Sequence, residues 1–76
     1  TGMWAEREVI GPGECTLLHW DVPDAEGVRV VGPGTDSSMI MPPRGDLEVC
    51  PEATDWYELK GLEWENLSRV QVTVGE

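Results

Sequence analysis

The pattern that most constrains this chain is a series of short alternating runs, each ended by glycine or proline after a few residues. The breakers include Gly11-Pro12-Gly13, Gly32-Pro33-Gly34 and Pro42-Pro43. Proline fixes φ and glycine supplies positive φ, so such segments end strands and form turns. No segment shows the 3.6-residue period of a helix. Six or seven short strands predict an all-β fold, a small antiparallel β-sandwich, with a five-stranded OB-type barrel as the alternative.

The clearest strand covers residues 14–22, and its side chains alternate between two faces. One face contains the largest side chain and is predicted to be the core face: Thr16, Leu18, Trp20 and Val22. The other face is predicted to point outward: Cys15, Leu17, His19 and Asp21.

The remaining runs extend this pattern. Strands are predicted at 28–31, 45–50, 55–60 and 69–74, with a short edge strand at 38–41 and a polar connection at 61–68. Their alternation predicts these core residues: Val28, Val30, Leu47, Val49, Tyr57, Leu59, Val70, Val72 and Val74. Residues 3–10 also alternate, as an edge strand, but the two faces of that run are ambiguous, and only Ile10 is a secure core residue.

Composition limits the class of protein. The chain has 76 residues and predicts one domain, 1–76, with 1–8 as an N-terminal edge strand or extension. A net charge of −10 argues against nucleic acid and anionic membranes as partners. No apolar run approaches the roughly 20 residues that span a bilayer, so no membrane insertion is expected. No leader precedes the first strand, so we expect any export signal to be removed or to lie outside this chain.

Several motifs together resemble a known family. They are residues 10–14 (Ile-Gly-Pro-Gly-Glu), Leu18-x-Trp20-x-Val22, Val49-Cys50-Pro51, Asp55-Trp56-Tyr57-x-Leu59 and Val70-x-Val72-x-Val74. In this order and spacing the chain is similar to bacterial immunoglobulin-like domains, modules of secreted and cell-surface proteins, over about residues 9–74. The chain departs from the family in the connection 61–68, which is longer and more acidic than the usual hairpin.

The resemblance implies an extracellular or cell-surface location, and a subset of the family carries cysteines at the positions of Cys15 and Cys50. In the implied topology, strands 14–22 and 45–50 are antiparallel neighbours. Both cysteines have outward parity, so we predict a disulfide on the outer face of that sheet. A bridge over this span contributes roughly 3–4 kcal/mol. Tyr57 lies where the family places a corner tyrosine, with its ring in the core and its hydroxyl bonded to upstream backbone.

Three tryptophans outside the core are candidates for an interface: Trp4, Trp56 and Trp64. Indoles favour protein interfaces and sugar stacking because they combine a wide apolar face with a polar N–H. The alternative is that they pack under the chain's own loops. We therefore expect a structural or adhesive module with a protein partner or neighbouring domain. The alternatives are a filament subunit that donates strand 1–8 to a neighbour, and a carbohydrate-binding module.

No residue set predicts catalysis, a metal site or a cofactor. His19 is the one histidine, and no nucleophile motif accompanies it. Asp21, Asp24 and Glu26 lack the spacing of a calcium loop, and two cysteines with one histidine are too few for zinc. Asn66-Leu67-Ser68 fits the N-glycosylation sequon in a predicted loop, and an unmodified Asn66 is the favoured interpretation.

Overall fold

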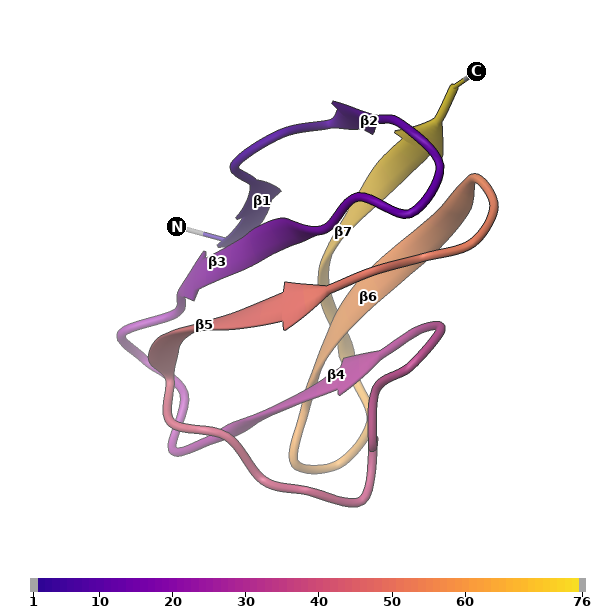
Figure 1. Cartoon of the computed structure of the whole chain (residues 1–76). Coiled ribbons are helices and arrows are strands. Elements are labelled where there is room, and N and C mark those ends of the chain that lie inside the picture. The colour runs from indigo at the N-terminus through magenta and orange to yellow at the C-terminus, as the bar shows by residue number, and fades with distance from the viewer. Residues whose placement is uncertain (1, 76) are drawn as a thin grey trace.

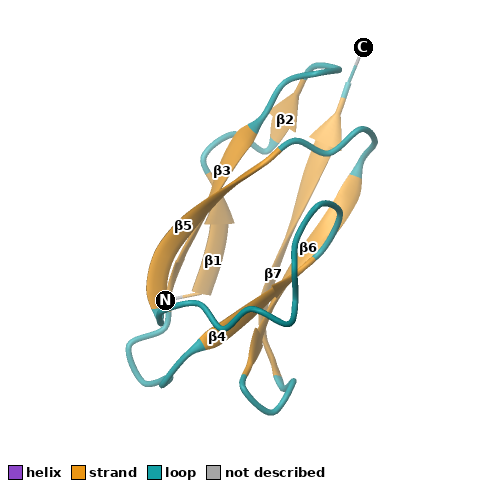
Figure 2. Cartoon of the chain, turned by 60° about the horizontal axis from the view of Figure 1, so that its bottom comes forward, coloured by secondary structure: helices purple, strands orange, loops and turns teal. Residues whose placement is uncertain are grey.

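The computed structural model describes residues 2–75 and contains, over that range, seven strands and no helix (Figure 1). The strands are β1 (Gly2–Ala5), β2 (Val9–Ile10), β3 (Thr16–Asp21), β4 (Val28–Val31), β5 (Arg44–Val49), β6 (Asp55–Gly61) and β7 (Asn66–Val74). One sheet has the order β1-β3-β5 and the other β2-β7-β6-β4. Neighbouring strands are antiparallel except β2 and β7, which are parallel. The two sheets form two layers (Figure 2), which confirms the sandwich and excludes the five-stranded barrel.

The N-terminal segment belongs to both sheets. β1 pairs with β3, and after a bend at Glu6–Glu8 the chain crosses to the other sheet, where β2 pairs with β7. Met3 and Ile10 have opposite parity in the sequence, yet both are buried because they face the core from different sheets. The prediction of one edge strand over residues 3–10 was therefore wrong, and the change of sheet explains why its two faces were ambiguous.

The core lies between the two sheets. It contains most of the predicted inward residues: Thr16, Leu18, Trp20, Val28, Val30, Val49, Tyr57, Leu59, Val70 and Val72. Val22, Leu47 and Val74 are only half-buried. Val22 follows the last residue of β3 and Val74 is the last residue of β7, so both lie at the ends of the sheets, where the opposite sheet covers them only in part. Leu47 lies on β5, which has a neighbouring strand on one side only.

The predicted edge strand at 38–41 is absent. The Asp36 carboxylate accepts hydrogen bonds from the backbone N–H and the hydroxyl of Ser38, and the Met39 N–H bonds to the Asp36 carbonyl. These contacts hold a turn, which competes with extended structure. The segment 38–41 forms one isolated β-bridge, in which Val28 and Met41 exchange two backbone hydrogen bonds of 2.8 and 3.0 Å.

The connection before the last strand is also shorter than predicted. β6 runs to Gly61 and β7 begins at Asn66, so the hairpin loop covers only residues 62–65. Trp64 adopts a φ of 67°, an uncommon conformation for a residue with a side chain, and this closes the turn. Asn66 consequently lies at the start of a strand rather than in a loop.

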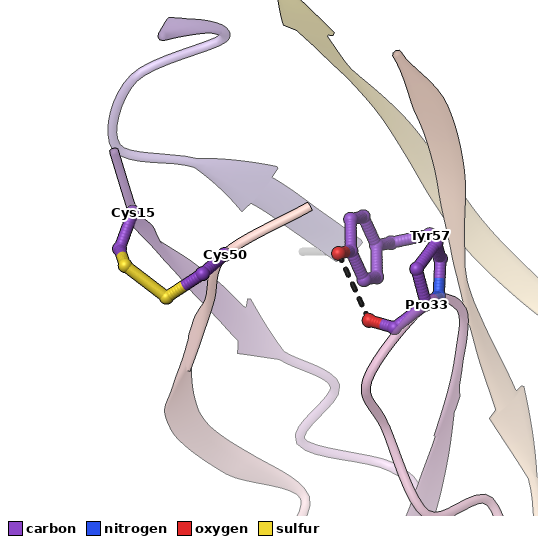
Figure 3. Close-up of a disulfide and its surroundings, with 4 residues drawn as sticks. All are labelled: Cys15, Pro33, Cys50 and Tyr57. Atoms are coloured by element: carbon purple, nitrogen blue, oxygen red, sulfur yellow. Dashed lines mark hydrogen bonds between the residues drawn. A yellow bond between two sulfur atoms is a disulfide. The ribbon is translucent and has the colours of Figure 1, made fainter. Parts of the chain in front are cut away.

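The predicted disulfide is confirmed. β3 and β5 pair with Thr16 opposite Val49, which places Cys15 and Cys50 opposite each other with 4.2 Å between their Cα atoms. The bridge lies on the outer side of the three-stranded sheet, away from the core residue Tyr57 (Figure 3). It joins the central strand of that sheet to its edge strand.

Candidate functional site

The three candidate tryptophans are exposed, but they do not form one patch. Trp4, Trp56 and Trp64 are 50%, 43% and 50% exposed. Trp4 lies on β1, in the three-stranded sheet, whereas Trp56 lies on β6 and Trp64 in the β6–β7 loop. Since all three point away from the core, they occupy opposite sides of the sandwich.

Trp56 pairs with an arginine across the sheet. The guanidinium carbon of Arg69, on β7, lies 4.4 Å from the centroid of the Trp56 ring. Such a cation–π contact contributes about 0.5–1 kcal/mol at an exposed site. Arg69 forms no ion pair with any carboxylate among residues 2–75. Its guanidinium lies over the indole, while its N–H groups remain able to bind a carboxylate.

A shallow groove of about 530 Å³ adjoins this pair. Its lining includes Trp56, Arg69, Gln71 and the exposed Val9 of β2. The groove therefore combines an aromatic ring, an aliphatic side chain and a fixed cation on one surface.

Trp64 makes a second pair of the same kind. The guanidinium carbon of Arg29, on β4, lies 4.6 Å from the centroid of the Trp64 ring. Arg29 also donates to the carbonyl oxygens of Ser37 and Ser38, at 3.1 and 3.3 Å. This arginine ties the β4–β5 connection to the outer surface of the sheet. We call this surface, with Trp56, Trp64, Arg29 and Arg69, the Trp–Arg face.

The Trp–Arg face has one pair near each end. Lys60, the partner of Arg29 in the β4–β6 register, lies four positions after Trp56, which corresponds to about 13 Å of strand. In the strand register Glu58 lies opposite Arg69 and Lys60 lies opposite Arg29. The Lys60 ammonium donates to the Asn66 side-chain carbonyl at 2.6 Å. The predicted sequon residue is thus exposed and engaged by a neighbouring strand.

Trp4 lies in a different environment. Its ring stacks on His19 with centroids 5.6 Å apart, and the His19 Nε2 is 3.3 Å from the Glu6 carboxylate. The outer side of this sheet also carries Asp21, Asp46 and Glu48. We call this surface, with Glu6, Asp21, Asp46 and Glu48, the acidic face.

Two exposed carboxylates are held in their charged form by hydrogen bonds. The Gly11 backbone N–H, with the charge of Arg7, lowers the pKa of Glu14 below its ordinary value. The Ser38 hydroxyl and backbone N–H lower the pKa of Asp36. Both groups fix turns at the ends of the sandwich rather than a site of chemistry.

Side chains of the kinds that bind metal ions come together at one place among the described residues. Within residues 2–75, the one group of three candidate ligands with donor atoms within 4.8 Å of one another is Cys15, Glu48 and Cys50. Its two sulfur atoms are bonded to each other, so neither is a thiolate ligand while the disulfide is intact. Asp24 and Glu26 line a separate groove of about 440 Å³ near the β6–β7 hairpin. In the same range, no helix has the length and hydropathy to cross a bilayer.

The sequence indicated the tryptophans but not their arginine partners. Arg29 and Arg69 become part of the surface only through the cross-strand register, which short-range patterns do not give. The available signal is their place in the alternation, with Arg29 between the predicted core residues Val28 and Val30 and Arg69 directly before Val70. Val9, Met39, Ile40 and Leu67 are also exposed and were not singled out.

No protein-family model matches the chain, and no curated protein or solved structure matches it significantly. The likeness to bacterial immunoglobulin-like domains therefore stays a prediction from the motifs.

Proposed function

We propose that this chain is a non-catalytic, extracellular immunoglobulin-like module with a structural or adhesive role, and that it contacts a protein partner through the Trp–Arg face. The observation that carries this proposal is the pairing of Trp56 with Arg69. An exposed indole and an arginine without a carboxylate partner are held together on a flat sheet surface. Tryptophan and arginine are the residues most enriched at the energetic centres of protein interfaces.

The location rests on the disulfide. Bridges between cysteines persist in oxidising compartments and are rare in the cytosol. A small domain without a large core also gains most from such a bridge. The Cys15–Cys50 bond and the motif resemblance both favour a secreted or surface module.

The alternatives have weaker support. Sugar stacking needs an open indole face, and Arg69 and Arg29 each cover one face of their tryptophan. Donation of the N-terminal strand to a neighbour needs a free segment, whereas β1 and β2 both pair within their own sandwich. His19 contacts Trp4 and Glu6 rather than a nucleophile, which favours a non-catalytic role.

Hydroxyl-radical footprinting tests the proposal residue by residue. The oxidation rates of Trp56, Trp64 and Trp4 are compared between the isolated domain and its native assembly. We expect Trp56 and Trp64 to be protected severalfold in the assembly. If both oxidise equally fast in the two samples, the Trp–Arg face is not an interface and the domain is a spacer.

A matched pair of variants adds a control. Trp56→Ala should release the domain from its assembly, while Glu52→Ala, which truncates an exposed side chain outside both the Trp–Arg face and the acidic face, should not. Equal release by both variants would contradict the assignment of the interface to the Trp–Arg face.

A further inference from the structure

The two outer surfaces of the sandwich differ in charge. The acidic face has four carboxylates, on Glu6, Asp21, Asp46 and Glu48, with Arg44 beside Asp21 and Arg7 at the edge near Glu6 and Glu48. The chain contains only 5 lysines and arginines, and three of them, Arg29, Lys60 and Arg69, lie on the Trp–Arg face.

The strands of that second surface contribute two carboxylates, Asp55 and Glu58, and Glu58 lies opposite Arg69 in the β6–β7 register. Glu8 lines the groove beside Arg69. In a chain with a net charge of −10, the strands of this sheet thus carry three cations and two carboxylates.

Unpaired charges lie on both surfaces. Among residues 2–75, Arg7 forms an ion pair with Glu14 and Arg44 with Asp21, and the His19 ring is hydrogen-bonded to Glu6. Asp46 and Glu48 are exposed and outside these pairs, as is Arg69 on the other side. Each surface therefore offers charges that the fold itself does not neutralise.

We propose that the partner of the Trp–Arg face is a second copy of this chain, which presents its acidic face. This inference rests on the proposed function and names the partner that it leaves open. Copies stack head to tail, with Arg69 and Lys60 of one copy facing Asp46 and Glu48 of the next. Complementary charge of this kind selects the partner and fixes the register of an interface.

The apolar groups of the two surfaces fit the same arrangement. Trp56 and Trp64 supply exposed rings on one side, and Trp4 and the half-buried Leu17 supply apolar area on the other.

The contact between the Trp–Arg face of one copy and the acidic face of the next is not symmetric. The two surfaces differ, so the contact is heterologous and each added copy exposes a fresh Trp–Arg face. The copies then form an open stack rather than a closed dimer.

Salt has opposing effects on this stack. Whole-chain repulsion between copies of charge −10 acts at long range, whereas the paired groups act at contact. We expect association to increase from low salt to physiological ionic strength, where the screening length is about 8 Å. It should decrease again in molar salt.

Charge-reversed variants test the arrangement by sedimentation velocity at physiological salt. One variant carries Lys60→Glu and Arg69→Glu, and the other Asp46→Lys and Glu48→Lys. In a solution of either variant alone, the two surfaces that meet have charges of the same sign. The repulsion between them should weaken association by roughly tenfold or more. An equimolar mixture should restore the parent's association, because the reversed surfaces complement each other.

Controls separate local from overall charge. Asp24→Lys with Glu52→Lys gives the same net charge as the reversed acidic face, but changes positions outside both faces. This variant should associate at least as well as the parent. Thermal unfolding of every variant checks that the exposed substitutions leave the sandwich folded.

The outcomes also separate this inference from the proposed function. A parent that stays monomeric at all salt concentrations, or a mixture that is not restored, overturns head-to-tail stacking. If Trp56 is nevertheless protected in the native assembly, the Trp–Arg face is an interface for a different protein. If Trp56 is unprotected as well, both proposals fail.

Discussion

Each sheet of the sandwich contributes one large aromatic residue to the core. Trp20 comes from β3 in the three-stranded sheet and Tyr57 from β6 in the four-stranded sheet, and both are fully buried. The Trp20 indole N–H donates to the Pro42 carbonyl at 2.8 Å, and the Tyr57 hydroxyl donates to the Pro33 carbonyl at 3.0 Å (Figure 3). Pro33 and Pro42 lie near opposite ends of the β4–β5 connection. One aromatic residue from each sheet is therefore hydrogen-bonded to this connection.

The two buried aromatic residues, Trp20 and Tyr57, are called the aromatic anchors below. They differ in the interactions that stabilise their strands. The strand of Trp20 is cross-linked to β5 by the Cys15–Cys50 bridge, whereas β6 is held to its neighbours by hydrogen bonds and packing alone. Each ring lies against a glycine, Gly45 beside Trp20 and Gly32 beside Tyr57. The comparison indicates that the three-stranded sheet is stabilised by the Cys15–Cys50 disulfide and the four-stranded sheet by the close packing of Tyr57 against Gly32.

The largest expected effect comes from truncating the anchor of the three-stranded sheet. Trp20→Ala leaves a cavity and removes the donor to Pro42, and should cost about 3–5 kcal/mol of unfolding free energy. Chemical denaturation with the disulfide intact measures this change. Trp20→Phe is the control, since it keeps an apolar ring and should recover most of the loss. A Trp20→Ala variant as stable as the parent would show that the indole does not support the core.

Removal of the disulfide should have the next largest effect. The double variant Cys15→Ala with Cys50→Ala frees the unfolded chain and should cost roughly 3–4 kcal/mol. Small domains have a total stability of about 5 kcal/mol at the lower end, so the variant should be close to unfolding. Thermal denaturation of the parent with and without reductant gives the same comparison. Two alkylatable thiols in freshly isolated native protein would contradict both the bridge and the extracellular location.

Strands with strict alternation could be predicted from the sequence. β3, β4 and the Val70–Val72 part of β7 place every second residue in the core. The predicted disulfide follows from the antiparallel neighbours of the resembled topology. Local patterns are sufficient where one strand stays in one sheet. They failed at residues 3–10, because the chain changes sheet there and Met3 and Ile10 face the core from two sides.

The candidate site could be predicted only in part. Exposure of Trp56 followed from its parity, but its contact with Arg69 depends on the β6–β7 register, which includes an irregularity between Leu59 and Lys60. The position of Trp64 depends on its positive φ, which no sequence rule assigns to tryptophan. Cross-strand contacts of this kind are tertiary features and are invisible to short-range periodicity.

A substitution at the glycine beside Tyr57 tests the close fit in the four-stranded sheet. A Cβ atom at Gly32 would overlap the Tyr57 ring, so Gly32→Ala should cost about 1–3 kcal/mol through displacement of the aromatic anchor.

The matched control for this variant is Gly45→Ala. There the nearest atom of Trp20 is 3.1 Å from the added Cβ, and a small shift relieves the contact. We expect this variant to lose less than about 1 kcal/mol. If both alanines are equally tolerated in thermal unfolding, the two anchors do not differ in their packing.

Removal of the Tyr57 hydroxyl alone should have a smaller effect. Tyr57→Phe keeps the ring in the core and leaves the Pro33 carbonyl without its donor, which should cost about 1 kcal/mol at neutral pH. Urea denaturation at constant slope measures the change. An unchanged midpoint would show that water replaces the phenol as the partner of Pro33.

The smallest expected effect is a pH dependence that belongs to the tyrosine anchor and not to the tryptophan. Burial raises the pKa of the Tyr57 hydroxyl above its ordinary value, and the charge of Asp55 acts in the same direction. Because the folded-state pKa is the higher one, the stabilisation is complete below the unfolded value of about 10 and is lost as pH rises through the folded value. The chain has 1 tyrosine, so phenolate absorbance reports this residue directly.

We expect the absorbance change of the folded protein to occur at higher pH than that of the urea-unfolded chain. We also expect the stability difference between the parent and Tyr57→Phe to shrink as pH rises above about 10. The phenylalanine variant shares every other alkaline reaction of the chain, including those of the disulfide, so parallel stability curves would contradict the raised pKa.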